Sequence, residues 1–367
     1  MKLLSLSLMN YRNIGEATLS LSPNVNCIVG HNGMGKTNIL DSIFYLSFCK
    51  GYASALDDRN IKHGEDFFMI RGDYQREDGG TEQINISLKR GGRKSVKRDE
   101  KAYRRLSEHL GRIPLVLIAP ADEYLVRGGA EERRRFMDMV IAQYDSCYIE
   151  ALNRYEASLK QRNAMLKAEQ EPDWAVMDIV EAMMSTDADY IYQKRQAFIK
   201  DFLPIFQMLY ARLCATDTEQ VSVAYDSHLE RGNLEEQLRT CRDKERIVGH
   251  TLHGVHRDDI NLLLGGHPLR YEGSQGQTKT YVIAMKLAQF LFLKEKGCGR
   301  TPILLLDDIF DKLDSKRVMK IMEFVSSNEM GQIFITDTNR ENIDKLIAAS
   351  TCDYKLFVVD EGVISEK

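Results

Sequence analysis

The chain has 367 residues, of which 43% are hydrophobic, 28% charged and 8% aromatic, with a formal net charge of −4. This is an ordinary globular composition, and it excludes predominant disorder. No apolar run approaches the ~18 residues that a membrane span needs, and seven scattered cysteines without a Cys-x-x-Cys pair indicate neither a disulfide framework nor a zinc site. We therefore expect a cytoplasmic protein of one to three domains.

The N-terminal residues predict strands that lead into a helix. Leu4, Leu6 and Leu8 alternate with polar residues, as in a half-buried strand. The same pattern, or a short apolar run, predicts strands at 19–21, 25–29, 84–88 and 115–118 and a helix at 39–48. A glycine-rich turn joins the strand at 25–29 to that helix.

Two long antiparallel helices are predicted between about residues 131 and 214. Glycine is absent there, charge is dense, and apolar residues recur with the helical period. Pro172 separates two arms of ~35–40 residues, each ~55 Å long at 1.5 Å per residue. Pro204 is expected to break the second arm.

The pattern of an α/β domain returns after the arm. It predicts strands at 221–225, 262–264, 303–306 and 333–335, helices at 277–296 and 315–326, and a hairpin at 357–364. The predicted fold class is thus α/β, with a helical arm inserted into the domain. The expected division is residues 1–125, then the arm at 126–216, then residues 217–367.

A complete phosphate-binding loop motif, G-x-x-x-x-G-K-[ST], lies between a predicted strand and a predicted helix. Its residues are Gly30, His31, Asn32, Gly33, Met34, Gly35, Lys36 and Thr37. Backbone N–H groups of such a loop enclose phosphate oxygens at a helix N-terminus. Lys36 is expected to reach the β- and γ-phosphates of ATP and to serve catalysis, and Thr37 to coordinate Mg²⁺.

Two further motifs fit a nucleotide site. The apolar run 303–306 ends in Asp307, expected to hold Mg²⁺, and Asp308, expected to act on the attacking water. Residues 273–277 (Gly-Ser-Gln-Gly-Gln) open a predicted helix, whose N–H groups can bind an anion. Since the loop already holds its nucleotide from one side, this second helix start is most useful when it comes from another subunit.

A basic stretch between residues 89 and 105 holds nine Lys or Arg side chains against two acids. The candidates for sequence-independent contacts with DNA phosphates are Lys89, Arg90, Arg93, Lys94, Lys97 and Arg98. The alternative is a solvated hairpin, and the run 133–135 (Arg-Arg-Arg) is equally open to the interpretation of a charged helix face. Tyr103 is the one aromatic residue in the stretch, which makes base stacking on single strands less favoured.

The order of these motifs resembles the ABC-type ATPase heads of DNA-repair proteins, and most closely the RecF family of bacterial recombination mediators. The matching stretches are 10–13 (Asn-Tyr-Arg-Asn), 30–38, 133–138 (Arg-Arg-Arg-Phe-Met-Asp), 254–259 (Gly-Val-His-Arg-Asp-Asp), 273–277 and 307–314. They span essentially the whole chain in order. The chain departs from the pattern at Val255, where Pro is usual, at Lys312, where Glu is frequent, at Asp308, where many ABC ATPases have Glu, and at Asp337, where transporters have a switch His.

The resemblance implies a homodimer that sandwiches two ATP molecules with Mg²⁺ and hydrolyses them slowly. It adds Asn38, Ser274, Gly276, Gln277 and Asp314 to the nucleotide-binding set, and Arg12 as a further contact. It also implies binding to duplex DNA and single-strand gap junctions, cooperation with RecR and RecO, and loading of RecA. For residues 254–259 the expected role is structural or nucleotide-sensing rather than metal binding.

Several alternatives remain at the level of sequence. An SMC-like tether that does not itself bind DNA would share these motifs but usually has a far longer arm. A transporter ATPase would not need the arm or the basic stretch, and a P-loop kinase would not need residues 273–277. A nuclease of the overcoming-lysogeny type would need a further acidic metal domain after Asp308, which we do not expect.

Overall fold

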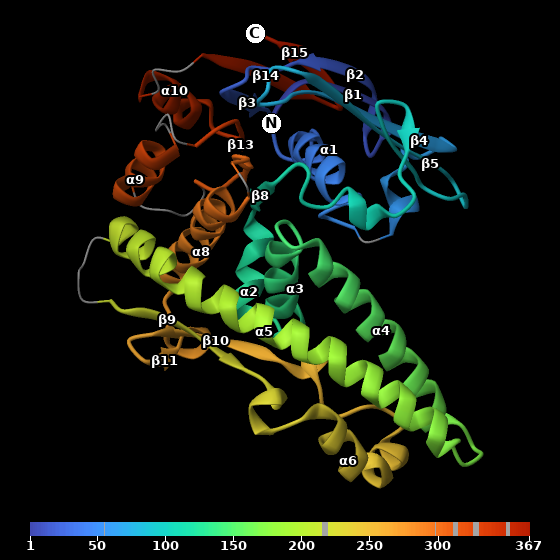
Figure 1. Cartoon of the computed structure of the whole chain (residues 1–367). Helices are drawn as coiled ribbons and strands as arrows, with labels where there is room; N and C mark the ends of the chain where they lie inside the picture. The colour runs from blue at the N-terminus through green and yellow to red at the C-terminus, as the bar shows by residue number, and fades with distance from the viewer. Residues whose placement is uncertain (55, 215–218, 298, 311–314, 326–329, 350–352) are drawn as a thin grey trace. The chain divides into compact units, whose positions relative to one another are not determined.

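The computed structural model describes residues 1–367 except 55, 215–218, 298, 311–314, 326–329 and 350–352 (Figure 1). The chain forms two compact units. The first comprises Met1–Asp122, Arg212–Ala215 and Ile283–Lys367. The second comprises Glu123–Ala211 and Thr216–Val282.

Two six-stranded sheets build the first unit. One is antiparallel, in the order β2-β1-β4-β5-β6-β7: β2 Ile14–Ser20, β1 Lys2–Tyr11, β4 Phe67–Gln75, β5 Thr81–Lys89, β6 Ser95–Arg98 and β7 Lys101–Ala102. The other has the order β15-β14-β3-β13-β12-β8: β15 Val363–Glu366, β14 Tyr354–Asp360, β3 Val25–Val29, β13 Ile333–Asp337, β12 Ile303–Asp307 and β8 Leu115–Ile118. Its strands are parallel except for the β14–β15 hairpin, which confirms the predicted hairpin.

Helix α1 (Lys36–Phe48) packs against strands of both sheets (Figure 1). Apolar side chains occur on every side of it, and Ile39, Ile43, Phe44 and Leu46 are each no more than 1% exposed. A helix that is hydrophobic on every side is stable only when it is covered on every side. Among the described residues this unit also contains α9 (Ser315–Val325), α10 (Arg340–Ala349) and most of a helix that begins in the second unit, together with the short turns Asp57–Asn60, Leu106–Glu108 and Pro120–Glu123.

The alternation predicted at the N-terminus is confirmed for Leu6 and Leu8 but not for Leu4. A register shift between Leu3 and Ser5 puts Leu3 in the core and leaves Leu4 half-buried. A bulge inserts one residue and so moves the following side chains to the opposite face. Strand β5 follows the predicted alternation, with Ile84, Ile86 and Leu88 buried.

The second unit combines a small antiparallel sheet with helices. The sheet has the order β11-β10-β9: β11 His267–Pro268, β10 Asp259–Leu264 and β9 Val221–Asp226. The helices are α2 Tyr124–Arg127, α3 Ala130–Ile141, α4 Ser146–Lys167, α5 Trp174–Leu213, α6 Leu234–Val248 and α7 Leu269–Glu272, with turns at His228–Arg231 and Val255–Arg257. Helix α8 (Gln275–Lys296) begins in this unit and continues into the first beyond Val282.

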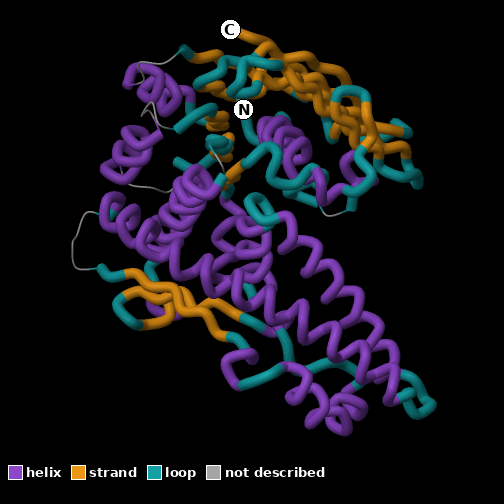
Figure 2. Tube along the Cα trace, in the orientation of Figure 1, coloured by secondary structure: helices purple, strands orange, loops and turns teal. Residues whose placement is uncertain are grey.

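This division differs from the expected boundary at residue 217, because residues up to Val282 belong with the arm. Strand β9 lies along α5 (Figure 2). The Tyr192 and Tyr225 rings stack there at 5.8 Å, and the Gln207 side-chain amide donates to the Val221 carbonyl at 2.9 Å. Strand β10 packs on α3. The strands after the arm therefore cover the arm itself, and residues 274–277 begin in that unit.

The observed arm also differs from the two helices of equal length that the sequence predicts. The first arm is divided into α3 and α4, because Asp145 caps a new helix by accepting the Tyr148 N–H at 3.1 Å. The second is one helix of 40 residues that continues through Pro204. Pro204 is exposed, so water can bond the carbonyl that its ring leaves without a donor. None of the described helices is both long and apolar enough to cross a membrane.

Candidate nucleotide site

The predicted phosphate-binding loop joins the buried strand β3 to the buried helix α1, which is the context that the motif requires. Gly33 and Gly35 have φ angles of 80° and 113°, which only glycine adopts without strain. The Lys36 Nζ donates to the carbonyl oxygens of Gly30 at 2.8 Å and His31 at 2.9 Å, so its ammonium lies across the loop. The side chain that should meet a phosphate is therefore held at the mouth of the loop.

Acidic groups surround this ammonium. Burial lowers the pKa of Lys36, and the carboxylates of Asp308, Asp307 and Asp337 oppose that shift. Asp337 ends β13, next to β12 in the sheet, and it accepts the Asn339 N–H at 2.7 Å. The carboxyl ends of adjacent parallel strands thus meet at the phosphate loop, as expected for ligand sites in such sheets.

Thr37 and Asp307 face each other directly. The Thr37 hydroxyl lies 3.0 and 2.9 Å from the two carboxylate oxygens of Asp307. The Thr336 hydroxyl donates to the same carboxylate at 2.6 Å. Burial raises the pKa of Asp307, while the hydroxyl bonds from Thr336 and Thr37 oppose the rise. A hydroxyl opposite a carboxylate is an all-oxygen donor set, so these residues fit Mg²⁺.

Asp308 follows directly after β12 and has a φ angle of 48°, a left-handed conformation that is uncommon outside glycine. Its backbone N–H donates to the carbonyl oxygen of Thr336 at 3.2 Å and to its hydroxyl at 3.1 Å. This turn directs the chain out of the sheet edge beside Lys36, with Thr336 anchoring both acids. Sequence reasoning did not identify Thr336, because a single threonine inside an apolar strand carries no motif.

Arg12 and Asp41 form a second polar cluster in this unit. The Arg12 guanidinium lies 3.3 Å from Asp41 Oδ2, and the Tyr11 hydroxyl donates to the same oxygen at 2.7 Å. Asp41 is 2% exposed, and its other oxygen accepts the Tyr52 N–H at 2.6 Å. Arg12 is thus held on α1 by a buried acid. Its contact with a nucleotide stays a prediction.

Residues 274–277 of the Gly-Ser-Gln-Gly-Gln motif lie in the second unit, at the start of α8. The Ser274 hydroxyl accepts the Gln277 N–H at 3.2 Å, and the Gln277 side-chain oxygen accepts the Ser274 N–H at 2.8 Å. This is a reciprocal capping box, which explains the Ser-x-x-Gln spacing in structural terms. Gly276 puts no side chain in front of the helix N-terminus, and Asp314 lies outside the described residues.

The six candidate DNA-contacting side chains of the basic stretch differ in their exposure to solvent and in their partners. Lys89, Arg90 and Arg93 are exposed, and Lys97 and Arg98 are half-buried. Lys94, in contrast, donates to the Cys49 carbonyl at 2.5 Å and to Asp57 at 2.7 Å. Its charge therefore stabilises the C-terminal end of α1. Its two partners make a DNA contact less favourable for Lys94 than for its exposed neighbours, and its role stays a prediction.

The Gly-Val-His-Arg-Asp-Asp element binds the arm of its own unit. Arg133 forms a two-point ion pair with Asp259 at 2.7 and 2.9 Å, and Arg134 donates to the Asp258 carbonyl at 2.7 Å. Asp258 is fully buried and accepts from Arg195 at 2.8 Å. Burial raises the pKa of Asp258, and Arg195 opposes the rise. These contacts fit the structural alternative, with Arg133 and Arg134 of the arginine run as partners, while a nucleotide-sensing role stays a prediction.

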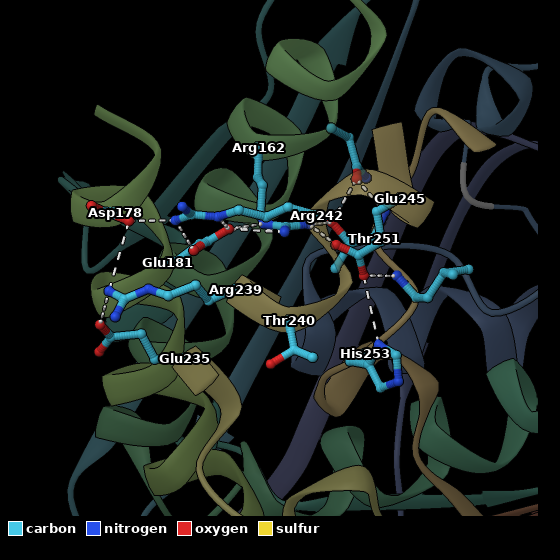
Figure 3. A network of polar contacts seen from close by, with 12 residues as sticks. Arg162, Asp178, Glu181, Glu235, Arg239, Thr240, Arg242, Glu245, Thr251 and His253 are labelled. Atoms are coloured by element: carbon cyan, nitrogen blue, oxygen red, sulfur yellow. Dashed lines mark hydrogen bonds and ion pairs between the residues drawn. The ribbon is translucent and has the colours of Figure 1, made fainter. Parts of the chain in front are cut away.

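A second ion network joins α4, α5 and α6 (Figure 3). The Arg162 guanidinium lies 2.9 Å from Glu181 and 2.6 Å from Glu245, and all three side chains are 0% exposed. Arg162 also donates to the Thr251 hydroxyl at 2.8 Å, while Arg242 binds Glu181 from the outside. Sequence patterns show only charged helix faces here. The paired residues lie up to 89 positions apart, so periodicity carries no signal of their contact.

Comparisons with known proteins agree with the motif order. The family model described as RecF/RecN/SMC N terminal domain matches residues 2–364. The DNA replication and repair protein RecF of Phocaeicola vulgatus is 49% identical over 362 residues, 99% of this chain and 97% of the relative. The chain belongs to the RecF family. RecF of Porphyromonas gingivalis is 47% identical over 98% of each chain.

Solved structures extend the family assignment to three dimensions. The structure of the recombination mediator protein RecF-ATP in the RecFOR pathway superposes with a TM-score of 0.89 at 25% identity, covering 100% of this chain and 97% of that one. An SMC head bound to the C-terminal winged-helix domain of ScpA has a TM-score of 0.61 at 16% identity, covering 100% and 97%. The fold is therefore the ABC-type ATPase head that RecF and SMC proteins share, with an inserted helical arm.

Proposed function

We propose that this chain is an ATP-dependent, DNA-binding recombination mediator that acts as a homodimer. The observation that carries the proposal is the convergence of Lys36, Thr37, Asp307 and Asp308 at one edge of the parallel sheet. The names of its RecF relatives, and a similar solved structure with ATP, support the same function.

Each residue of the site has a distinct task in this proposal. The loop N–H groups and the Lys36 ammonium bind the phosphates, and Lys36 exchanges its carbonyl partners for phosphate oxygens. The Thr37 hydroxyl and the Asp307 carboxylate hold Mg²⁺, which neutralises charge on the phosphates when it is bound. Asn32, Met34 and Asn38 belong to the same binding segment.

Hydrolysis is proposed to be slow and to act as a timer, stimulated by DNA. Asp308 orients the attacking water, but its carboxylate is one methylene shorter than that of the usual Glu. Asp337, where transporters have a switch His, is bound to Asn339 at 2.7 Å and to Asn342 at 3.0 Å. Both carboxylate oxygens of Asp337 are therefore already bound, and Asp337 does not serve as a second base beside Asp308 in this proposal.

The partner copy completes the site in this proposal. Ser274, Gly276 and Gln277 begin α8, and the first N–H groups of a helix carry partial positive charge. We infer that they contact the γ-phosphate held by Lys36 of the other subunit, with Asp314 also near that junction. ATP binding then stabilises the dimer, and loss of the γ-phosphate releases it.

The dimer is proposed to bind duplex DNA and single-strand gap junctions through the basic stretch, with Lys89, Arg90, Arg93, Lys97 and Arg98 as the main contacts. RecR, with RecO, and the loading of RecA are the partners and outcome that family membership implies. An SMC-like tether that does not bind DNA is the alternative, and the shared SMC head fold supports it. DNA binding distinguishes the two.

The test is ATP-driven dimerisation, measured by light scattering after size exclusion with ATP and Mg²⁺. Lys36→Ala should stay monomeric because ATP binding is lost. Ser274→Arg should bind ATP yet stay monomeric, whereas Ser274→Thr, which keeps a capping hydroxyl, should dimerise. Normal dimerisation of Ser274→Arg would contradict the cross-subunit role, and dimerisation of Lys36→Ala would contradict the nucleotide switch.

A further inference from the structure

The tip of the C-terminal hairpin contacts the phosphate-binding loop. Strands β14 and β15 pair up to Asp360 and Val363, so Glu361 and Gly362 form the turn. The Gly362 N–H donates to the Met34 carbonyl at 3.0 Å. The Glu361 N–H lies 3.3 Å from the Met34 sulfur. A segment more than 320 residues away in the sequence thus binds the middle of the loop.

The turn between β1 and β2 binds the same carbonyl. The Asn13 side-chain amide donates to the Met34 oxygen at 2.9 Å. Its own oxygen accepts from the Asn38 side chain at 2.7 Å. Asn13 therefore connects the residue before Gly35 to the first turn of α1, and the Met34 carbonyl receives two donors.

The three segments are in close backbone contact. A Cβ on Gly362 would lie 2.6 Å from the Asn13 carbonyl oxygen, and one on Gly35 would lie 2.6 Å from the Asn13 side chain. A Cβ on Gly30 would lie 2.4 Å from the Val359 carbonyl oxygen. At Gly30 and Gly362 the close atoms belong to the backbone and leave no room for a side chain, and at Gly35 the φ of 113° itself favours glycine.

The consequence follows from peptide geometry. The carbonyl of Met34 and the N–H of Gly35 belong to one planar trans peptide and point in opposite directions. Two donors that hold the carbonyl toward Asn13 and Gly362 therefore direct the Gly35 N–H away from them. In a phosphate-binding loop this N–H is one of the groups that enclose the phosphates.

We propose that Asn13 and the Glu361–Gly362 turn are positioning residues for the nucleotide: they hold the Met34–Gly35 peptide in the orientation that binds phosphate. The inference rests on the proposed function, because it assumes that this loop binds ATP. It adds that two segments outside the motif preorganise the loop before the nucleotide arrives. Preorganised donors bind more tightly, since no ordering is needed on binding.

Titration of a fluorescent ATP analogue with Mg²⁺ tests this proposal with Asn13→Ala and Gly362→Ala. Gly79→Ala is the matched control: Gly79 has a φ of 82°, close to the 81° of Gly362, but a Cβ there would meet nothing within 4 Å. The control therefore has the same backbone cost without the contact. We expect Asn13→Ala and Gly362→Ala to weaken affinity about tenfold. The first removes a donor to the Met34 carbonyl, and the methyl group of the second meets the Asn13 carbonyl oxygen and displaces the turn that carries the other donor. Gly79→Ala should bind like the parent.

ADP affinity should fall by the same factor, because the loop binds phosphates that ADP retains. Urea unfolding of each variant shows whether it is folded at the assay temperature, and if Gly362→Ala is not, Asn13→Ala decides. Affinities within twofold of the parent for a folded Asn13→Ala would overturn the inference. A parent chain that binds no analogue, or a Lys36→Ala variant that binds it equally well, would instead overturn the proposed function.

Discussion

The titration of His256 offers the most quantitative prediction. Its ring nitrogens contact the Tyr155 hydroxyl at 2.7 Å and the Thr251 carbonyl at 3.2 Å. Burial lowers its pKa from 6.5 to about 4; the Thr251 carbonyl opposes this, and the nearby Arg257 and Arg134 add to the lowering. Below pH 6.5 His256 is therefore protonated in the unfolded chain, whereas in the folded chain it stays neutral down to about pH 4.

The sign of the effect follows directly. Stability that His256 contributes at pH 7 is lost as the pH falls from 6.5 toward 4, because the unfolded state binds more protons throughout this window. A tenfold change in proton affinity corresponds to ~1.4 kcal/mol, so the whole window is worth about 3 kcal/mol. Replacing the imidazole with an amide, His256→Gln, removes this pH dependence while keeping a polar side chain.

Urea unfolding at pH 7.0, 6.0, 5.0 and 4.5 measures it, with fluorescence of Trp174, the sole tryptophan of the chain, as reporter. The ring of Trp174 lies 5.1 Å from the Arg242 guanidinium, in the same unit as His256. The parent should lose stability relative to His256→Gln as the pH falls, and His250→Gln, at an exposed histidine, should follow the parent. A constant difference between parent and His256→Gln across this range would refute the reasoning.

Three other predictions concern the ion networks, the Mg²⁺ site and the basic stretch. Arg162→Met should cost about 3–5 kcal/mol of stability, because it leaves Glu245 buried without its guanidinium partner and Glu181 with Arg242 alone. Trp174 fluorescence in urea measures this loss, and a loss below about 1 kcal/mol would contradict a fully buried network. As the pH is lowered, MgATP affinity should begin to fall at a higher pH than an ordinary aspartate would give, because the raised pKa of Asp307 protonates this Mg²⁺ ligand at a higher pH. An MgATP affinity that does not change between pH 7.5 and 5.0 would count against Asp307 as a ligand. Neutralising Arg93 together with Lys97 should reduce the dependence of log K for duplex binding on log salt by about two, at ~0.9 per phosphate contact; an unchanged slope returns the stretch to a solvated hairpin.

Much of the candidate site could be predicted from sequence because its residues are adjacent in the chain. The phosphate-binding loop and the Asp307–Asp308 pair are local motifs, each next to a strand that apolar runs identify. Thr336 belongs to no such motif, and the stretch 10–13 that contains Asn13 gives no sign of its contact with Met34, since both roles arise when distant segments meet in the fold. Their partners lie 29 and 21 residues away.

The differences between the predicted and the observed fold also arise from contacts that the local sequence does not show. The boundary expected at residue 217 differs from the observed division into two units, because strand patterns do not show which helices a strand packs against. The single predicted first arm missed the Asp145 cap, which is a local signal inside a continuous apolar period. Helix α6 was not predicted: its exposed face is dense in charge, and Leu234 and Leu238 are its buried apolar residues.

Arginines in the arm show that a charged sequence pattern does not always indicate a solvated helix face. Arg133, Arg162 and Arg195 are equivalent in sequence to solvated helix residues, yet each forms an ion pair, in which Arg162 and Arg195 are buried and Arg133 is half-buried. Their acidic partners come from other elements, and pairing makes burial of the charge tolerable. Sequence reasoning therefore identified the arm but not what stabilises it.

The central claim is that ATP binding produces a DNA-binding dimer. Binding of the full chain to labelled duplex DNA, with Mg²⁺ and with or without a non-hydrolysable ATP analogue, tests it most directly. Our account predicts tighter binding with the analogue, a steep salt dependence, and no gain from the analogue in Lys36→Ala. An absence of DNA binding in either condition would contradict it and favour a tethering ATPase of the SMC type.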